Sequence, residues 1–202
     1  MKGQLYKVLN GDGACHGGDG AWSLPHDGEP GDWMPAIVDK LVPCRNGYHL
    51  CREGDLAQWL HRDIYTAGYR GEMVECNNKV VVREARLLAH MDTWNERTAR
   101  LFACDCAEHV AHMGDEAVLQ QTIAVARRYA NGEATNSELA PAWAAAGDTA
   151  GVAAWARAGA AAGDTAWDTA WVAAWDTAGA TAWVAEIEWQ TARLMHYLEV
   201  TK

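Results

Sequence analysis

The chain has 202 residues, enough for one large domain or two small ones, and its formal net charge is −10. Proteins that bind nucleic acid or anionic membranes use clustered Lys and Arg, so this acidic balance disfavours both kinds of partner. The start of the sequence has no signal-peptide core, and no stretch is apolar enough to span a membrane. We therefore expect a cytoplasmic protein whose six cysteines are reduced.

Residues 1–94 are typical of a mixed α and β domain. The segments "LYKVLN" (5–10) and "KVVVREARLL" (79–88) carry the β-branched residues and partial alternation of strands. Between them, residues 11–35 are rich in Gly, Asp and Pro and predict a long loop, while residues 54–68 have apolar side chains at helical spacing. The simplest prediction is a β-loop-α-β unit.

Residues 95–202 have a different pattern, which predicts helices almost throughout. An apolar face runs along residues 96–114, and residues 115–132 combine an acidic start, a basic last turn and a glycine stop. Thr135 and Glu138 then have the spacing of a capping box that opens a further helix. The predicted fold class is α+β: a small N-terminal mixed α/β domain followed by an Ala/Trp-rich all-α helical bundle or short helical solenoid.

Residues 143–186 repeat a tetrapeptide whose first position is Trp or Gly and whose fourth is almost always Ala. A period of four advances by about 40° per repeat around a helix, so one straight rod would turn its tryptophans in every direction. The segment "AGDTA" occurs twice and supplies a glycine stop followed by an Asp or Thr cap. We therefore predict shorter helices at 138–146, 149–162, 165–178 and 180–199.

Trp167, Trp171 and Trp175 form one stripe on such a helix, opposite a face of Ala and Thr. The first interpretation of the stripe is packing inside a helical core. The second is a protein-binding face, to which Trp183 would belong, because Trp is a favoured interface anchor. A third, an ice-binding Ala/Thr face, fits poorly with the large indoles.

Two groups of residues have the chemistry of metal ligands. Cys44, His49 and Cys51 offer zinc donors, but their spacing is irregular and no pair of CxxC units is present. A second group, on one face of the helix predicted at 96–114, consists of Asp105, His109 and His112. The alternative interpretation of this group is an ordinary exposed polar face. We assign neither group as a metal site and expect no cofactor.

Catalytic motifs are also missing from the sequence, which has no phosphate loop, no dinucleotide fingerprint and no HExxH. Cys104 and Cys106 lie close to a histidine, but their amphipathic helix predicts that they pack in a core. The order of strands and helix in residues 1–94 is similar to small ADP-ribosyltransferase-like folds, an analogy at the level of the fold alone. We assign no catalytic residue.

Residues 95–198 resemble an all-helical family of immunity proteins, through "RTARLFACDCAEHV", "AVLQQTIAVARRYANGEAT" and the Ala-rich repeat. Residues 106–108 match its Cys-Ala-Glu element. The matches to its second element are Ala126, Arg127, Tyr129, Gly132 and Glu133. The resemblance implies a helical protein that binds a macromolecular target.

The first ninety or so residues resemble a domain of unknown function in phage and actinobacterial proteins, through "YKVL", "PCRNGYHLC" and "DLAQWL". That resemblance implies no activity.

We expect a non-enzymatic protein-binding module, immunity- or antitoxin-like or a phage counter-defence protein, whose protein partner is a toxin or defence component. An acidic surface suits a basic target. The first alternative is a ligand-binding protein or ADP-ribosyltransferase-like enzyme with its site in the N-terminal domain, among Tyr6, Lys7, Tyr48, His49 and Trp59. The second alternative is a structural protein that forms homo-oligomers through its Trp stripes.

The domain boundary is predicted between residues 94 and 95.

Overall fold

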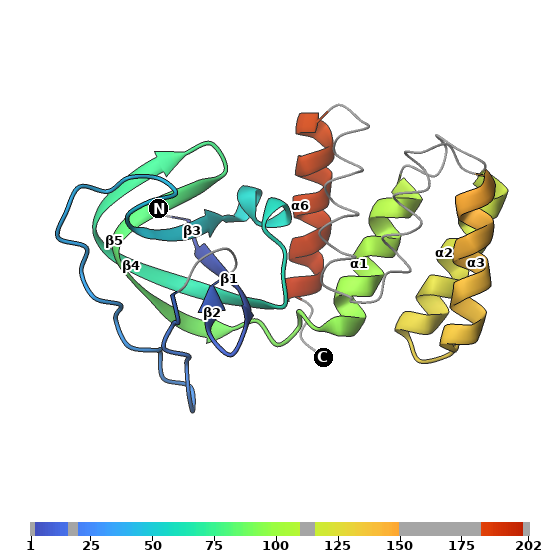
Figure 1. The fold of residues 1–202 in the computed structure, drawn as a ribbon, viewed down its shortest axis with the longest axis horizontal. Helices are drawn as coiled ribbons and strands as arrows, with labels where there is room; N and C mark the ends of the chain where they lie inside the picture. The colour runs from blue at the N-terminus through green and yellow to red at the C-terminus, as the bar shows by residue number, and fades with distance from the viewer. Residues whose placement is uncertain (1–2, 16–19, 110–115, 150–182, 200–202) are drawn as a thin grey trace. The chain divides into compact units, whose positions relative to one another are not determined.

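A computed structural model describes residues 3–15, 20–109, 116–149 and 183–199 of the chain. The chain divides into two compact units, Met1–Asp92 and Thr93–Lys202. Figure 1 shows that strands dominate the first unit and helices the second. Among the described helices, none is long and apolar enough to cross a membrane.

The N-terminal unit is an antiparallel sheet that closes on itself. Its elements are β1 (Leu5–Gly11), β2 (Ala14–Cys15), β3 (Tyr48–Arg52), the 3-10 helix η1 (Glu53–Gln58), β4 (Asp63–Cys76) and β5 (Lys79–His90). The strand order is β2-β1-β3-β5-β4, and β1 also pairs with β4. This extra pairing joins β1, β3, β5 and β4 into a ring (Figure 1).

The core of this unit lies on one face of each strand, because successive side chains of a strand point to opposite faces. Leu5 and Leu9 of β1 share that face, and Lys7 lies between them in the alternation. The buried members of the core cluster are Leu5, Leu9, Trp22, Leu50, Tyr65, Ala67, Val80, Val82, Ala85 and Leu87. Burying one such aliphatic side chain stabilises the fold by about 1.5–3 kcal/mol.

The long hairpin of β4 and β5 is bent by two irregularities in its register, between Thr66 and Ala67 and between Arg70 and Met73. Gly71 lies in the second one with a φ of +75°, a conformation that favours glycine. Such bulges bend a strand and increase its twist. We infer that they let β4 pair with β5 along its length and also reach β1.

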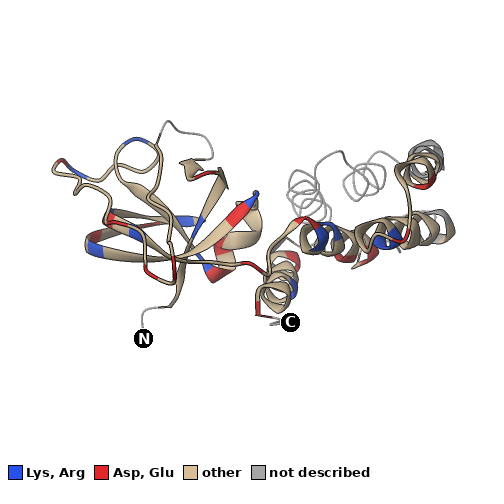
Figure 2. Cartoon of the chain, turned by 90° about the horizontal axis from the view of Figure 1, so that it is seen from below, with Lys and Arg blue, Asp and Glu red and all other residues tan. Residues whose placement is uncertain are grey.

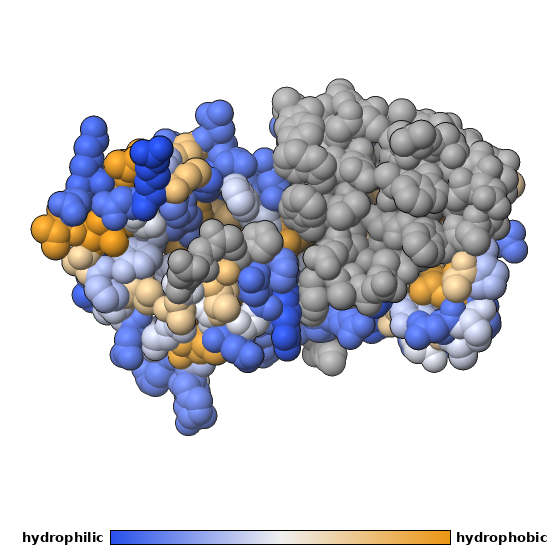
Figure 3. Space-filling view, viewed as in Figure 1, coloured by the Kyte–Doolittle hydropathy of each residue, from blue (hydrophilic) through white to orange (hydrophobic). Residues whose placement is uncertain are grey.

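The segment of residues 20–47 connects β2 to β3 and runs along β5. The amides of Gly31, Met34 and Ile37 donate to carbonyl groups of β5 at 2.8–3.0 Å, so part of that strand's edge is covered. The same segment carries the large apolar side chains that are exposed among the described residues: Leu24, Val38 and Val42. Figure 3 shows orange, hydrophobic atoms among hydrophilic ones on the visible surface of this unit.

The described helices of the C-terminal unit are α1 (Glu96–His109), α2 (Glu116–Ala130), α3 (Asn136–Thr149) and α6 (Trp183–Glu199). Helix α1 packs on α2 and on α6, and α2 packs on α3. A buried carboxylate joins three of them: Asp105 of α1 pairs with Arg127 of α2 at 2.7 Å, and with Arg193 and the Tyr197 hydroxyl of α6 at 2.5 and 2.6 Å. This network satisfies a charge that burial would otherwise destabilise.

Local signals that the sequence carries set the ends of α2 and α3. Gly132 has a φ of +75°, its amide donates to the Tyr129 carbonyl, and the Glu133 amide donates to the Arg128 carbonyl, which is a Schellman motif. The glycine stop predicted for the end of α2 is therefore confirmed. The carboxylate of Glu138 accepts from the Thr135 amide at 2.8 Å, so that half of the predicted capping box is confirmed.

The predicted fold class, a small mixed α/β domain followed by an Ala/Trp-rich helical bundle or short solenoid, is wrong. The chain is a mixed fold in which a five-stranded antiparallel sheet makes up the N-terminal region and the described C-terminal region has four helices. The strands predicted at 5–10 and 79–88 are confirmed as β1 and β5.

The helix predicted at 54–68 is the main error in the N-terminal region. Only Glu53–Gln58 is helical, as a 3-10 helix, and Asp63–Cys76 is a strand. The side chains of Ile64, Tyr65 and Thr66 favour a strand, and pairing with β1 and β5 overrides the helical spacing. Strand β4 therefore lies between η1 and β5, where the ADP-ribosyltransferase-like analogy had no element.

The prediction that a helix ends at residue 146 is also wrong, because α3 continues through Gly147 to Thr149. A glycine inside a helix costs about 1 kcal/mol relative to alanine, which neighbouring alanines can offset. The helices predicted at 149–162 and 165–178 lie largely or wholly outside the described residues. The last predicted helix, 180–199, is confirmed as α6 from Trp183 onward.

Gly47, just before β3, provides a test of how tightly the sheet is packed. Its φ is +129°, and a Cβ there would lie 2.3 Å from Cγ1 of the fully buried Val81. We expect Gly47→Ala to lower the free energy of unfolding by about 1–3 kcal/mol in urea titrations. Gly54→Ala is the matched control, because a Cβ at Gly54 meets nothing within 4 Å. Equal stability of the two variants would contradict this packing.

Candidate functional site

A cavity of about 670 Å³ opens in the N-terminal unit where β1 and β3 separate. The two strands pair at Leu5↔Arg52 and Tyr6↔Cys51, and farther along the same edge β1 pairs with β2 at Leu9↔Cys15. Lys7 and Val8 therefore lie at a fork between β3 and β2. Residues of both strands, of the segment before β3 and of the region around η1 line the cavity, which we call the fork pocket.

Lys7 is the residue at the fork. Its Nζ donates to the His49 carbonyl at 3.3 Å and lies 5.1 Å from the centre of the Trp22 ring. Among the described residues these are its only polar and ring contacts, so further N–H donors of the ammonium are available to a ligand. Burial lowers the pKa of Lys7, and the nearby thiols of Cys15 and Cys51 partly oppose that shift.

His49 of β3 also lines the fork pocket, with its tautomer set by the backbone. The Cys44 amide donates to its Nε2 at 2.9 Å, so Nε2 is the acceptor and the proton of the neutral ring is on Nδ1. Burial lowers the pKa of His49, and the ammonium groups of Lys79 and Lys7 lower it further. The imidazole is therefore neutral at neutral pH, and its Nδ1–H is a donor.

Lys79, the first residue of β5, supplies a second ammonium. Its Nζ lies 4.7 Å from the centre of the Trp59 ring and donates to the Cys44 thiol at 3.2 Å. Arg45, beside Cys44, adds a third cation to the lining. Cys44 itself has a φ of +62°, which turns the chain sharply before β3.

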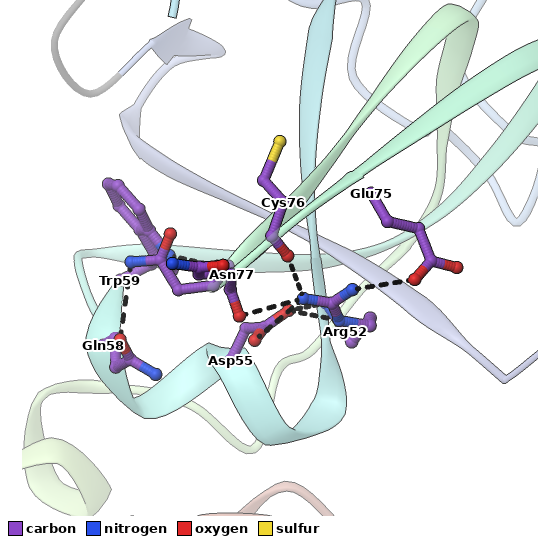
Figure 4. A network of polar contacts seen from close by, with 8 residues as sticks. Arg52, Asp55, Gln58, Trp59, Glu75, Cys76 and Asn77 are labelled. Atoms are coloured by element: carbon purple, nitrogen blue, oxygen red, sulfur yellow. Dashed lines mark hydrogen bonds and ion pairs between the residues drawn. The ribbon is translucent and has the colours of Figure 1, made fainter. Parts of the chain in front are cut away.

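An Arg52 network holds the wall on which Trp59 lies (Figure 4). The Arg52 guanidinium bonds the Asp55 carboxylate at 2.7 Å and the Cys76 carbonyl at 2.7 Å, which ties η1 to the turn between β4 and β5. The indole Nε1 of Trp59 donates to the Asn78 carbonyl in the same turn, also at 2.7 Å. These bonds fix the Trp59 ring beside Lys79.

The charge of the fork pocket is opposite to that of the chain. Its lining includes Lys7, Arg45 and Lys79 and, among the residues that the structure describes, no Asp or Glu. The chain as a whole has a net charge of −10, with acidic and basic residues spread over both units in Figure 2. A pocket of donors without carboxylates suits an anion.

The predicted binding residues fall into two groups. Tyr48, His49 and Trp59 all line the fork pocket, and the Tyr48 hydroxyl donates to the Pro35 carbonyl at 2.7 Å. Lys7 joins them, whereas Tyr6 is in the buried interior. Trp167, Trp171 and Trp175 lie outside the described residues, and of Trp183 only its backbone position at the start of α6 is described.

Lys79, Arg45 and Trp22 are lining residues that sequence reasoning missed. Lys79 comes from a strand far from Lys7 in the chain, and no local motif marks it. Arg45 lies next to Cys44 in "PCRNGYHLC", the one segment that could have pointed to it.

The candidate metal ligands do not form a site in the described part of the chain, where no cluster of three or more ligand residues is found. Burial raises the pKa of Cys51 to about 12, so its thiol keeps its proton, and the Cys44 thiol contacts Lys79. The Asp105 carboxylate already pairs with Arg127 and Arg193 and accepts from the Tyr197 hydroxyl. His112 lies outside the described residues. Cys104 and Cys106 are fully buried, so their predicted packing role is confirmed.

No protein-family model, no curated protein and no solved structure matches this chain.

Asp55 anchors the Arg52 network and gives a test of the pocket wall. Its carboxylate accepts from the Arg52 amide and guanidinium, at 3.2 and 2.7 Å. We expect Asp55→Ala to lower the free energy of unfolding by about 1.5–3 kcal/mol, the range for bonds to charged groups. Glu53→Ala, an exposed position in the same 3-10 helix, is the control in parallel urea titrations. A loss no larger than that of the control would show that the network does not support this wall.

The lowered pKa of Lys7 predicts a pH-dependent effect on stability. Below that pKa the folded protein buries an ammonium, so Lys7→Met should raise the free energy of unfolding at neutral pH. As pH rises from the lowered folded value toward the ordinary 10.5, the folded amine becomes neutral while the unfolded one stays charged, and the wild type gains relative to the variant. Urea titrations at neutral pH and near pH 10.5 measure the difference, with exposed Lys40→Met as control. A gain that does not shrink at high pH would refute this account.

Proposed function

We propose that the N-terminal unit is a binding module for a small organic anion, which occupies the fork pocket. The observation that carries the proposal is the ammonium of Lys7, which is partly buried at the fork and has a single hydrogen-bond acceptor among the described residues. An ammonium has three donors, and leaving donors unused away from water costs free energy. An anionic oxygen in the pocket would satisfy them.

The other polar groups of the lining support the same ligand charge. Lys79 and Arg45 are cations, and His49 offers an N–H donor because its Nε2 already accepts from the Cys44 amide. Charge-assisted hydrogen bonds to such donors are roughly twice as strong as neutral ones. The size of the cavity, about 670 Å³, is within the range of pockets that hold small organic ligands.

Two of the described lining residues that could take part in catalysis are already engaged or protonated. The Cys51 thiol is buried and has a raised pKa, and His49 uses its Nε2 on a backbone amide. Binding is therefore the function that these side chains favour, in line with the ligand-binding alternative from the sequence. The prediction of a toxin or defence partner rests on the resemblance of residues 95–198 to immunity proteins and on the acidic charge of the chain, and it stays a prediction. Trp167, Trp171 and Trp175, the binding residues predicted for it, lie outside the described residues.

Calorimetric titration of the full-length protein with inorganic phosphate, pyrophosphate, citrate and adenosine monophosphate tests the proposal. At least one of these anions should bind, and Lys7→Met should weaken that binding about ten- to a hundredfold, as expected for a lost charged hydrogen bond. Lys79→Met should weaken it too, and Lys40→Met, outside the pocket, should leave it unchanged. The proposal fails if none of the four probes binds, or if Lys40→Met has the same effect as Lys7→Met.

A further inference from the structure

The fork pocket is too large to be filled by a lone inorganic anion. Its volume of about 670 Å³ equals that of roughly twenty water molecules at about 30 Å³ each. A phosphate or carboxylate at Lys7 would leave most of this space to water. A ligand that fills the pocket therefore has a second part besides its anionic group. The remaining lining residues indicate the chemistry of that second part.

The lining residues away from the three cations are mainly aromatic and apolar. Trp22 and Tyr48 meet edge to face with ring centres 5.5 Å apart, and Met34 packs against the same core cluster. Trp59 is partly exposed, and its ring is fixed through the bond from Nε1 to the Asn78 carbonyl. A rigid, partly exposed indole is a platform on which a planar ring can stack.

Lys79 connects the aromatic part of the pocket to the cationic part. In the structure its ammonium lies 4.7 Å from the centre of the Trp59 ring and donates to the thiol of Cys44, the residue whose amide donates to the His49 imidazole. A planar ring that stacks on Trp59 would take the place of this cation–π contact. The freed ammonium would then pair with an anionic group of the same ligand. The cation–π contact is thus replaced by a ring stack on Trp59 and an ion pair with Lys79.

The number of cations favours a phosphate over a carboxylate. Lys7, Lys79 and Arg45 bring three positive charges to one cavity. A phosphomonoester carries a charge between −1.5 and −2 at neutral pH, and its three oxygens accept from several donors at once. A monocarboxylate would leave more than one of these cations without a counter-charge.

From these observations we infer that the fork pocket binds a nucleoside phosphate, with the base stacked on Trp59 and the phosphate held by Lys7, Lys79 and Arg45. This inference rests on the proposed anion-binding function and adds the class of ligand.

The comparison of whole and partial ligands tests the inference on the wild-type, full-length protein. Adenosine monophosphate and uridine monophosphate should bind, and both ribose phosphate and adenosine should bind at least about tenfold more weakly, because each lacks one part of the ligand. If ribose phosphate binds as tightly as the nucleotides, the ligand class is wrong while anion binding stands. If no anion binds, both proposals fail. Tighter binding of a single-stranded oligonucleotide than of either mononucleotide would also overturn the ligand class, in favour of nucleic acid.

Matched tryptophan variants test the stacking platform. Trp59→Leu should weaken adenosine monophosphate about tenfold and leave ribose phosphate unchanged, and Trp59→Phe should restore most of the affinity. Trp33→Leu is the control, because Trp33 is also partly buried and has the Arg70 guanidinium 3.8 Å from its ring centre but does not line the pocket. Equal losses at Trp59 and Trp33, or equal losses for nucleotide and ribose phosphate, would refute stacking on Trp59.

Discussion

Strand β1 has to share one of its edges between two partners, and the pocket follows from that division. Along its other edge it pairs with β4 at five positions, from Leu5↔Ala67 to Leu9↔Asp63, and this pairing closes the sheet. The shared edge begins with β3 and ends with β2. Because a strand edge can bond only one neighbour at each residue, β3 must leave β1 where β2 approaches. The closed sheet and the open fork thus have the same cause.

Lys7 is at the fork and breaks the apolar alternation of β1. Its neighbours on the same face, Leu5 and Leu9, are buried in the core, and a leucine in its place would continue the pattern. The lysine stem can pack on apolar surface while the ammonium reaches the His49 carbonyl and the Trp22 ring. Burial removes the ammonium partly from water, which lowers the pKa of Lys7. Proteins tend to keep such costs at functional sites.

The acidic charge of the chain and its cationic pocket act over different distances. At physiological salt the screening length is about 8 Å, so distant carboxylates act weakly on a ligand in the pocket. Lys7, Lys79 and Arg45 line the cavity itself and act at contact distance. The net charge, which disfavours nucleic acid on the outer surface, therefore does not oppose a small anion inside. The net charge of the chain therefore describes its outer surface and not the charge inside one cavity.

Features that depend only on neighbouring residues can be predicted from the amino-acid sequence. The end of α2 at Gly132, the Thr135–Glu138 cap and the strands at β1 and β5 follow from caps, glycine conformation and alternation, which act over a few residues. Tyr48, His49 and Trp59 were chosen from the sequence as binding residues, and the structure brings them to one cavity. In contrast, the strand at residues 63–68 and the position of Lys79 beside Trp59 cannot be predicted in this way. Both depend on pairing between strands that are far apart in the chain, and no local sequence pattern indicates which strands will pair.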